Sequence, residues 1–212
     1  MLKVHAVVPK GFAANCYIVS DGGEAFVVDP GGGAEELLAF LRDNRLAVRY
    51  IFLTHGHFDH IGALDAVRRA TGAQAVIHKA DAPYLANTRL NASFLSEGVV
   101  CAGADITVSG GETFLLGAHE TGVLHTPGHT PGSVCLKIGT YLFTGDTLFE
   151  DDCGRCDFPG GSRAEMLRSL RLLASLPGDY TVLPGHDVST TLDRERRVNA
   201  DMLKALAQGD GQ

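Results

Sequence analysis

The sequence contains no apolar run long enough to cross a lipid bilayer. Its longest hydrophobic stretches have the length of a β-strand, whereas a spanning helix needs about 20 residues. The N-terminus also lacks the apolar core of a secretory signal, because Pro9, Lys10 and Gly11 interrupt it early. We therefore expect a cytoplasmic protein with no membrane partner.

Cysteines and basic residues are both scarce. The five cysteines are an odd number without framework spacing, which argues against a disulfide-stabilised secreted fold and fits a reducing cytoplasm. The 18 basic residues are outnumbered by 25 acidic ones, giving a net charge of −7. A general nucleic-acid binder normally carries a basic face, so we expect no nucleic-acid partner. Nothing in the pattern specifies an oligomeric state.

The composition that remains is that of an ordinary globular protein. The 212 residues are 45% hydrophobic and 20% charged, which predicts one domain over residues 1–212 with a substantial core. The sequence shows no internal repeat or low-complexity segment. Residues 208–212 are expected to form a frayed tail.

Strand-like and helix-like segments alternate along the chain. Apolar runs bounded by Gly, Asp and Pro predict strands, and apolar residues at three- or four-residue spacing predict helices. Strands are expected at 2–8, 14–19, 25–29, 50–54, 75–78, 114–116, 123–125, 134–138, 141–144 and 181–183, and helices at 34–45, 61–70, 164–176 and 192–207. This interleaving predicts a layered α/β fold.

The densest chemical signal is the motif HGHFDH at residues 55–60, which follows an apolar run. It reads as a loop of metal ligands at the end of a strand. Imidazole together with carboxylate suits zinc, iron or manganese, whereas thiolate-rich sets favour structural zinc or iron–sulfur clusters. Alternation can project His55, His57 and Asp59 to one side of the turn. His60 would then point elsewhere, and two neighbouring metals would use both groups.

Three further candidate ligands lie in similar settings. His129, Asp146 and His186 each follow an apolar run and adjoin glycine, often with proline, which is how a strand end presents a polar side chain. A lone histidine is most often an ordinary surface or core residue, but seven candidate ligands at strand ends are a strong signal. The sequence therefore predicts a metal site, although spacing alone shows only that the ligands are available.

These motifs resemble those of the metallo-β-lactamase-fold hydrolases, from Asn15 to about His186. The block GRCDFPGG at residues 154–161 is most similar to the small, single-domain glyoxalase II-like (hydroxyacylglutathione hydrolase-like) branch, which usually has Thr or Ser at the position of Cys156. The resemblance implies a four-layer αβ/βα sandwich with metals at one edge between two sheets. It also implies the ligands: His55, His57 and His129 for metal 1, Asp59, His60 and His186 for metal 2, and Asp146 bridging both.

The resemblance implies two divalent cations, with zinc favoured and iron or manganese as alternatives. A hydroxide bridging the metals would attack an activated carbonyl, because metal binding lowers the pKa of water to roughly 7. Asp59 and Asp146 would orient that hydroxide. The implied function is hydrolysis of a small-molecule thioester such as S-lactoylglutathione to a hydroxy acid and a free thiol. Larger glyoxalase II enzymes bind glutathione through a C-terminal domain that is not expected after His186, so the carrier could equally be coenzyme A or a bacterial thiol.

Three residues are expected to support the ligands without binding metal. Asp29, at the end of a predicted strand, would accept a hydrogen bond from a ligating histidine; the alternative is an ordinary turn residue before Pro30. Arg155 and Asp157 would form a buried ion pair in the wall of the site, and the alternative is a solvated loop pair.

Other histidines and cysteines are expected to have ordinary roles. The remaining histidines, His5, His78, His119 and His125, are interpreted as surface or packing residues. The CxxC pair formed by Cys153 and Cys156 could be redox-active or metal-binding. No second such pair completes a zinc site, so a structural role is favoured.

Related chemistries fit the same residues to different degrees. The true β-lactamases lack a His ligand at the position of His60 and have Cys at that of Asp146. The RNA-processing nucleases and flavin-linked di-iron relatives add domains, and the latter have Glu at the position of His57. Lactone and other ester hydrolases share the ligands and stay open.

The main alternative of another class resembles the persulfide dioxygenases. These oxidoreductases hold a single iron, which would lie here on His55, His129 and Asp146. The residues Pro-Gly-Gly that follow Phe158 favour the hydrolase branch instead. Metal storage or sensing is disfavoured, because the ligand set leaves room for water.

Overall fold

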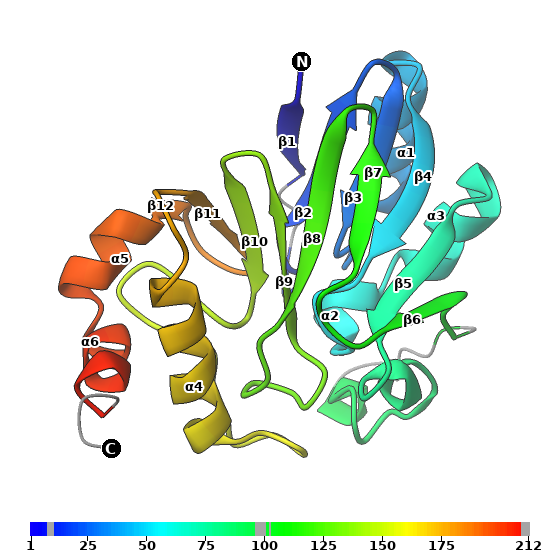
Figure 1. The fold of residues 1–212 in the computed structure, drawn as a ribbon. Coiled ribbons are helices and arrows are strands. Elements are labelled where there is room, and N and C mark those ends of the chain that lie inside the picture. Colours follow the sequence, from blue (N-terminus) through cyan, green and yellow to red (C-terminus); the bar gives the residue numbers. More distant parts are fainter. Residues whose placement is uncertain (8–10, 96–100, 102, 209–212) are drawn as a thin grey trace.

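The computed structural model describes residues 1–7, 11–95, 101 and 103–208. Its strands form two six-stranded sheets (Figure 1). The first has the order β1-β2-β3-β4-β5-β6 and the second the order β12-β11-β10-β9-β8-β7. The first contains β1 (Lys3–Val7), β2 (Cys16–Asp21), β3 (Glu24–Val28), β4 (Ala47–Phe52), β5 (Gln74–His78) and β6 (Ile106–Val108). The second contains β7 (Thr113–Leu116), β8 (His119–His125), β9 (Val134–Ile138), β10 (Tyr141–Gly145), β11 (Thr181–Pro184) and β12 (Thr190–Thr191).

Helices cover the outer faces of this pair of sheets. They are α1 (Ala34–Asp43), α2 (Phe58–Ile61), α3 (Leu64–Thr71), α4 (Arg163–Ala174), α5 (Leu192–Val198) and α6 (Ala200–Ala207), with two 3-10 turns, η1 (Ala82–Ala86) and η2 (Ser93–Leu95). Figure 1 shows α1 and α3 beside the first sheet, and α4 to α6 on the far side of the second. None of the helices in the described part of the chain is long and apolar enough to cross a membrane.

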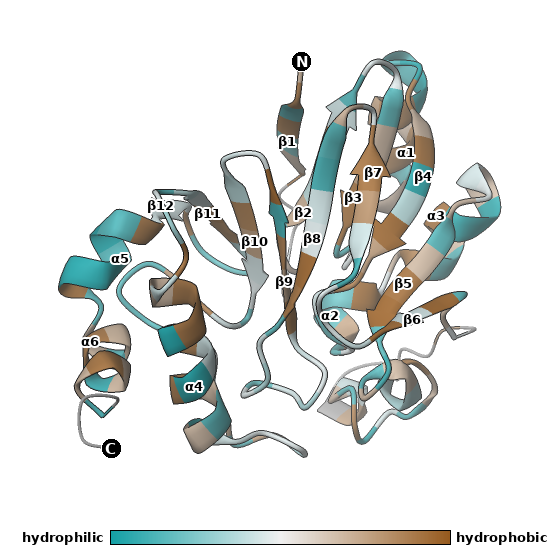
Figure 2. Ribbon diagram, in the orientation of Figure 1, coloured by the Kyte–Doolittle hydropathy of each residue, from teal (hydrophilic) through white to brown (hydrophobic). Residues whose placement is uncertain are grey.

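The central strands are apolar on both faces, because each face packs against another layer (Figure 2). In β3, Ala25 and Val27 pack with the residues of α1 and α3, whereas Phe26 and Val28 pack between the two sheets. A third cluster joins the second sheet to α4 and α6. The predicted four-layer αβ/βα sandwich is therefore confirmed.

The structure divides two predicted helices. In the segment 61–70, Ile61 ends α2 and Leu64 begins α3. Gly62 lies between the two helices, and an added Cβ there would collide with the carbonyl oxygen of Gly31. The segment 192–207 breaks at Asn199, whose extended backbone (ψ 114°) ends α5. The Asn199 side chain then accepts hydrogen bonds from the backbone N–H groups of Asp201 and Met202 and so caps α6.

The sequence did not predict two short strands. Strand β6 has 3 residues and β12 has 2, and both lie at sheet edges, where so few residues give little periodic signal. Of the predicted tail, Gln208 caps α6 and residues 209–212 lie outside the described part.

The candidate site residues follow the carboxyl ends of strands from both sheets. Asp29 follows β3, residues 54–60 follow β4, His129 follows β8, Asp146 follows β10 and His186 follows β11. Strands β3 and β4 are parallel, as are β10 and β11, so these ends meet at one edge of the sandwich.

Candidate metal centre

Asp29 fixes the loop that follows β4. Its backbone has a φ of 50°, and its carboxylate accepts hydrogen bonds from Thr54 N at 2.7 Å and Thr54 Oγ1 at 2.6 Å. The same carboxylate lies 3.0 Å from Nδ1 of His60. Asp29 thus contacts a candidate histidine ligand, as expected from its position at the end of a strand.

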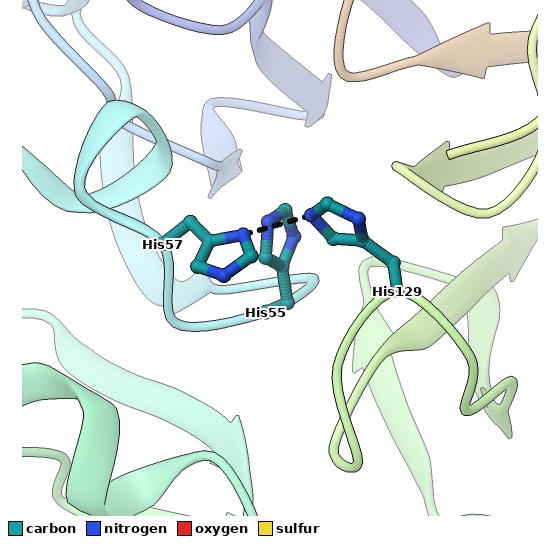
Figure 3. A group of neighbouring side chains, drawn as sticks. All are labelled: His55, His57 and His129. Atoms are coloured by element: carbon teal, nitrogen blue, oxygen red, sulfur yellow. Dashed lines mark hydrogen bonds between the residues drawn. The ribbon is translucent and has the colours of Figure 1, made fainter. Parts of the chain in front are cut away.

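Three buried imidazoles face one another at the centre of the site (Figure 3). His55 and His57 come from the loop after β4, and His129 comes from the loop between β8 and β9. His57 Nδ1 lies 2.8 Å from His129 Nε2. The His55 ring centroid lies 4.8 Å from that of His57 and 4.7 Å from that of His129. A cation among these rings would have three nitrogen ligands within reach.

Asp146 lies between this trio and a second group. In the second group, His186 Nε2 is 3.0 Å from Asp59 Oδ2, and His60 Nε2 is 3.8 Å from the same oxygen. Asp146 Oδ1 is 3.3 Å from His60 Nε2, and its Oδ2 is 3.5 Å from His129 Nε2 and 3.7 Å from His186 Nε2. The structure therefore brings all seven predicted ligands together. Within each of three overlapping triads, the possible ligand atoms lie within 4.8 Å of one another: His55, His57 and His129; His55, His60 and Asp146; and Asp59, His60 and His186.

Unsatisfied buried atoms show that this cluster suits metal ions. Nε2 of His55 and His60, and Oδ1 of Asp146, are buried without a hydrogen-bond partner among the described residues. Such atoms are costly unless something compensates them. His129 can donate from Nδ1 to the carbonyl oxygen of Arg155 at 2.7 Å, and this bond leaves its Nε2 lone pair facing the cluster.

The protonation states of these groups also suit cation binding. Burial, together with neighbouring imidazoles such as His60, holds the pKa of His55 well below its usual value. Burial and His129 lower the pKa of His57 to about 3. Burial acts to raise the pKa of Asp146, but His60 and the other imidazoles outweigh it, so that this pKa is lowered. Neutral imidazoles and an ionised carboxylate are the forms that bind metals.

Three carboxylates surround His60 and favour its charged form. Burial alone would lower its pKa, but Asp146, Asp29 and Asp59 together raise it well above the usual value. The carboxylates around His60 therefore favour a positive charge at this position.

Asp81 supports the ligand loops, and its role was not predicted. This fully buried carboxylate accepts hydrogen bonds from Gly56 N at 3.0 Å, Gly132 N at 2.7 Å and Thr130 Oγ1 at 2.7 Å. It joins the loop of His57 to the loop that carries His129. The sequence signal that could have identified Asp81 is its position three residues after the strand predicted at 75–78.

The predicted burial of the Arg155–Asp157 pair is wrong. The bidentate ion pair is present, but the two side chains are 59% and 65% exposed, because this loop runs along the rim of the site. Arg155 contributes through its backbone oxygen, which accepts from His129. Its guanidinium lies 4.3 Å from the centroid of the Phe158 ring.

The two thiols of the cysteine pair make hydrogen bonds within the protein. All five cysteines are free. Cys153 contacts Arg163 Nη1 at 3.0 Å and Asp201 Oδ2 at 3.2 Å, and burial raises its pKa to about 12. The thiol of Cys153 is therefore protonated at neutral pH, and a protonated thiol is a poor nucleophile. His78 and His125 stack on each other at 4.1 Å, outside the ligand cluster.

Part of the ligand cluster lines a cleft of about 390 Å³. Several candidate ligands and Arg155 line the cleft, as do three phenylalanines: Phe58, Phe149 and Phe158. The metals would therefore be accessible to a small molecule from one side.

A protein-family comparison agrees with this geometry. Residues 9–186 match the model of the metallo-beta-lactamase superfamily. The chain belongs to the metallo-beta-lactamase superfamily. The family prediction made from the ligand motifs is thus confirmed, and the superfamily's metallo-hydrolases provide the relevant comparisons.

Curated superfamily relatives include probable and assigned hydrolases. The probable metallo-hydrolase YqgX of Bacillus subtilis is 35% identical over 191 residues, which are 88% of this chain and 90% of YqgX. The hydroxyacylglutathione hydrolase of Anaeromyxobacter dehalogenans is 40% identical over 172 residues, which are 81% of this chain but only 60% of that enzyme.

Solved structures of the superfamily are similarly varied. The BLEG-1 B3 metallo-beta-lactamase has a TM-score of 0.89 at 33% identity, covering 94% of this chain and 99% of that one. ETHE1 from Myxococcus xanthus has a TM-score of 0.78 at 29% identity, and the match covers 93% of this chain and 83% of ETHE1. TTHA1623, in a di-iron-bound form, has a TM-score of 0.81 at 34% identity, and the match covers 92% of this chain and 98% of TTHA1623. A protein described as a B3 metallo-beta-lactamase is therefore among the structures similar to this chain.

Proposed function

We propose that this superfamily member is a metal-dependent thioester hydrolase of the hydroxyacylglutathione hydrolase type. The observation that carries the proposal is the convergence of seven His and Asp side chains, some with unsatisfied buried atoms, five of which line an open cleft. The 40% identity to a hydroxyacylglutathione hydrolase supports the thioester substrate.

The proposed ligand set divides into two groups that share Asp146. His55, His57 and His129 would hold one cation, and Asp59, His60 and His186 the other, with zinc favoured over iron or manganese. Two such cations would supply a hydroxide nucleophile at neutral pH and polarise the carbonyl of the substrate.

The protein's own groups set the geometry of this reaction. Asp29 holds the His60 ring through Nδ1, and the Arg155 carbonyl holds the His129 ring in the same way, so that both Nε2 atoms face the cluster. Asp59 Oδ2 lies 3.0 Å from His186 Nε2 at the cleft surface, where it would orient the attacking water. No serine or cysteine nucleophile is required.

The proposal predicts chelator-sensitive hydrolysis of S-lactoylglutathione. Purified protein loaded with zinc, and separately with iron or manganese, is mixed with the thioester, and thiol release is followed with a chromogenic thiol reagent. We expect rapid release that a chelator abolishes and that added metal restores. Fully metallated protein that releases no thiol from this thioester or from a second glutathione thioester would contradict the thioester assignment.

The likeness to ETHE1 supports one second candidate. A single iron on His55, His129 and Asp146 would suit an oxidoreductase that resembles the persulfide dioxygenases. Oxygen uptake with glutathione persulfide by iron-loaded protein, without thioester hydrolysis, would favour this candidate.

A further inference from the structure

Three phenylalanine side chains line the cleft above the candidate ligands. Phe58, Phe149 and Phe158 come from three separate segments, and each is only partly buried. Aromatic rings left partly exposed around a concave site commonly contact the apolar part of a ligand. We refer to these three residues as the phenylalanine wall.

Apart from the candidate ligands, two charged residues line the cleft. They are Asp152 and Arg155. The Arg155 guanidinium is already paired with Asp157, through Nε at 2.6 Å and Nη2 at 2.7 Å. It also covers one face of Phe158, at 4.3 Å from the ring centroid. The Arg155 end of the cleft therefore combines a cation with an aromatic ring.

Phe149 borders a candidate ligand, whereas Phe158 borders a guanidinium group. The Phe149 ring lies edge-on to candidate ligand His186, with 6.3 Å between centroids, and the described residues place no cation over it. Its backbone is anchored, because Phe149 N donates to the Asp152 carbonyl at 3.0 Å and its own carbonyl accepts from Asn199 Nδ2 at 3.5 Å. A supported loop thus holds the ring beside the proposed metal centre.

We propose that the cleft selects thioesters with an apolar, preferably aromatic, acyl group, and that Phe149 contacts this group. The inference rests on the proposed function and specifies its substrate class. An anionic acyl group would meet the Asp152 carboxylate, and a lactoyl group is too small to cover the phenylalanine wall. In hydrophobic pockets one extra methylene is worth about 10–200-fold in specificity, so a phenyl ring in place of a methyl group should raise kcat/KM at least about tenfold.

A matched pair of substrates tests the selection. S-Mandeloylglutathione and S-lactoylglutathione share the thiol and the α-hydroxyl and differ in phenyl against methyl. We expect the metal-loaded protein to hydrolyse the mandeloyl thioester with a kcat/KM at least about tenfold higher. Equal efficiency, or a preference for lactoyl, would overturn the inference while leaving the proposed function in place. Hydrolysis of neither thioester would overturn the proposed function and the inference together.

Variants locate the selection at Phe149. Phe149→Ala should lower kcat/KM for the mandeloyl thioester at least about tenfold, and by a larger factor than it lowers kcat/KM for the lactoyl thioester. Phe149→Leu, which keeps an apolar side chain, should have a kcat/KM for the mandeloyl thioester between those of the unchanged protein and Phe149→Ala. Phe12→Ala is the control, since this ring is 88% exposed and does not line the cleft. Thermal midpoints of the variants check folding. An equal loss for both substrates in folded Phe149→Ala would contradict a contact with the acyl group.

Discussion

Replacing Asp146 by alanine is expected to reduce the bound metal from two ions per chain to one or none, and to lower kcat/KM for thioester hydrolysis by about 10³-fold or more. One oxygen of Asp146 faces His60, and the other faces His129 and His186. Removing the carboxylate therefore takes an anionic ligand from both halves of the proposed centre. Lost electrostatic stabilisation at a reacting centre typically costs about 10²–10³-fold for a single neutral donor, and a shared metal ligand should cost more.

Metal analysis of dialysed protein and steady-state kinetics measure the two effects of this substitution. Asp146→Asn keeps the shape and removes the charge, so it separates ligand loss from a packing defect. Asp43→Ala is a surface control, because this carboxylate is 70% exposed. An Asp146→Ala protein that keeps two metals and full activity would refute the assigned bridge.

Replacing Asp81 by alanine should destabilise the protein by about 3 kcal/mol and weaken metal binding about 10–100-fold. The substitution leaves the N–H groups of Gly56 and Gly132 and the hydroxyl of Thr130 without their buried acceptor. A buried donor left unsatisfied costs roughly 1–3 kcal/mol. Partners that orient metal ligands typically affect affinity by about 10–100-fold, and Asp81 joins the loops of His57 and His129.

Urea denaturation and competition for zinc with a chromophoric chelator measure the two effects of the Asp81 substitution. Asp105→Ala provides a matched control. Asp105 also accepts a backbone N–H, from Ala75 at 2.7 Å, and pairs with Arg68, but it lies outside the ligand cluster. Its loss should reduce stability by about 1 kcal/mol and leave zinc affinity unchanged. Unchanged zinc affinity in folded Asp81→Ala would refute a positioning role.

The candidate ligands could be predicted because each has a local signal. Four lie in one contiguous motif, and His129, Asp146 and His186 each follow an apolar strand and adjoin glycine. The layered fold was predictable for a related reason. Strands buried on both faces read as continuous apolar runs, and leucines at helical spacing mark the helices that cover them.

Other features depend on contacts that one sequence does not display. Asp81 binds Gly56 and Gly132, which lie 25 and 51 residues away, and both donate through the backbone, so no residue type reveals the pairing. The spacing of Arg155 and Asp157 predicts an ion pair, but the path of the loop decides that it is exposed. The helix break at Asn199 depends likewise on its contacts with the backbone carbonyl groups of Phe149 and Asp152.

The most direct test of the proposed centre is anomalous X-ray diffraction from crystals of the zinc-loaded protein. The proposal predicts two anomalous peaks about 3.5–4 Å apart, one among His55, His57 and His129 and the other among Asp59, His60 and His186, with Asp146 between them. A single peak on His55, His129 and Asp146, or no peak in the cluster, would contradict it.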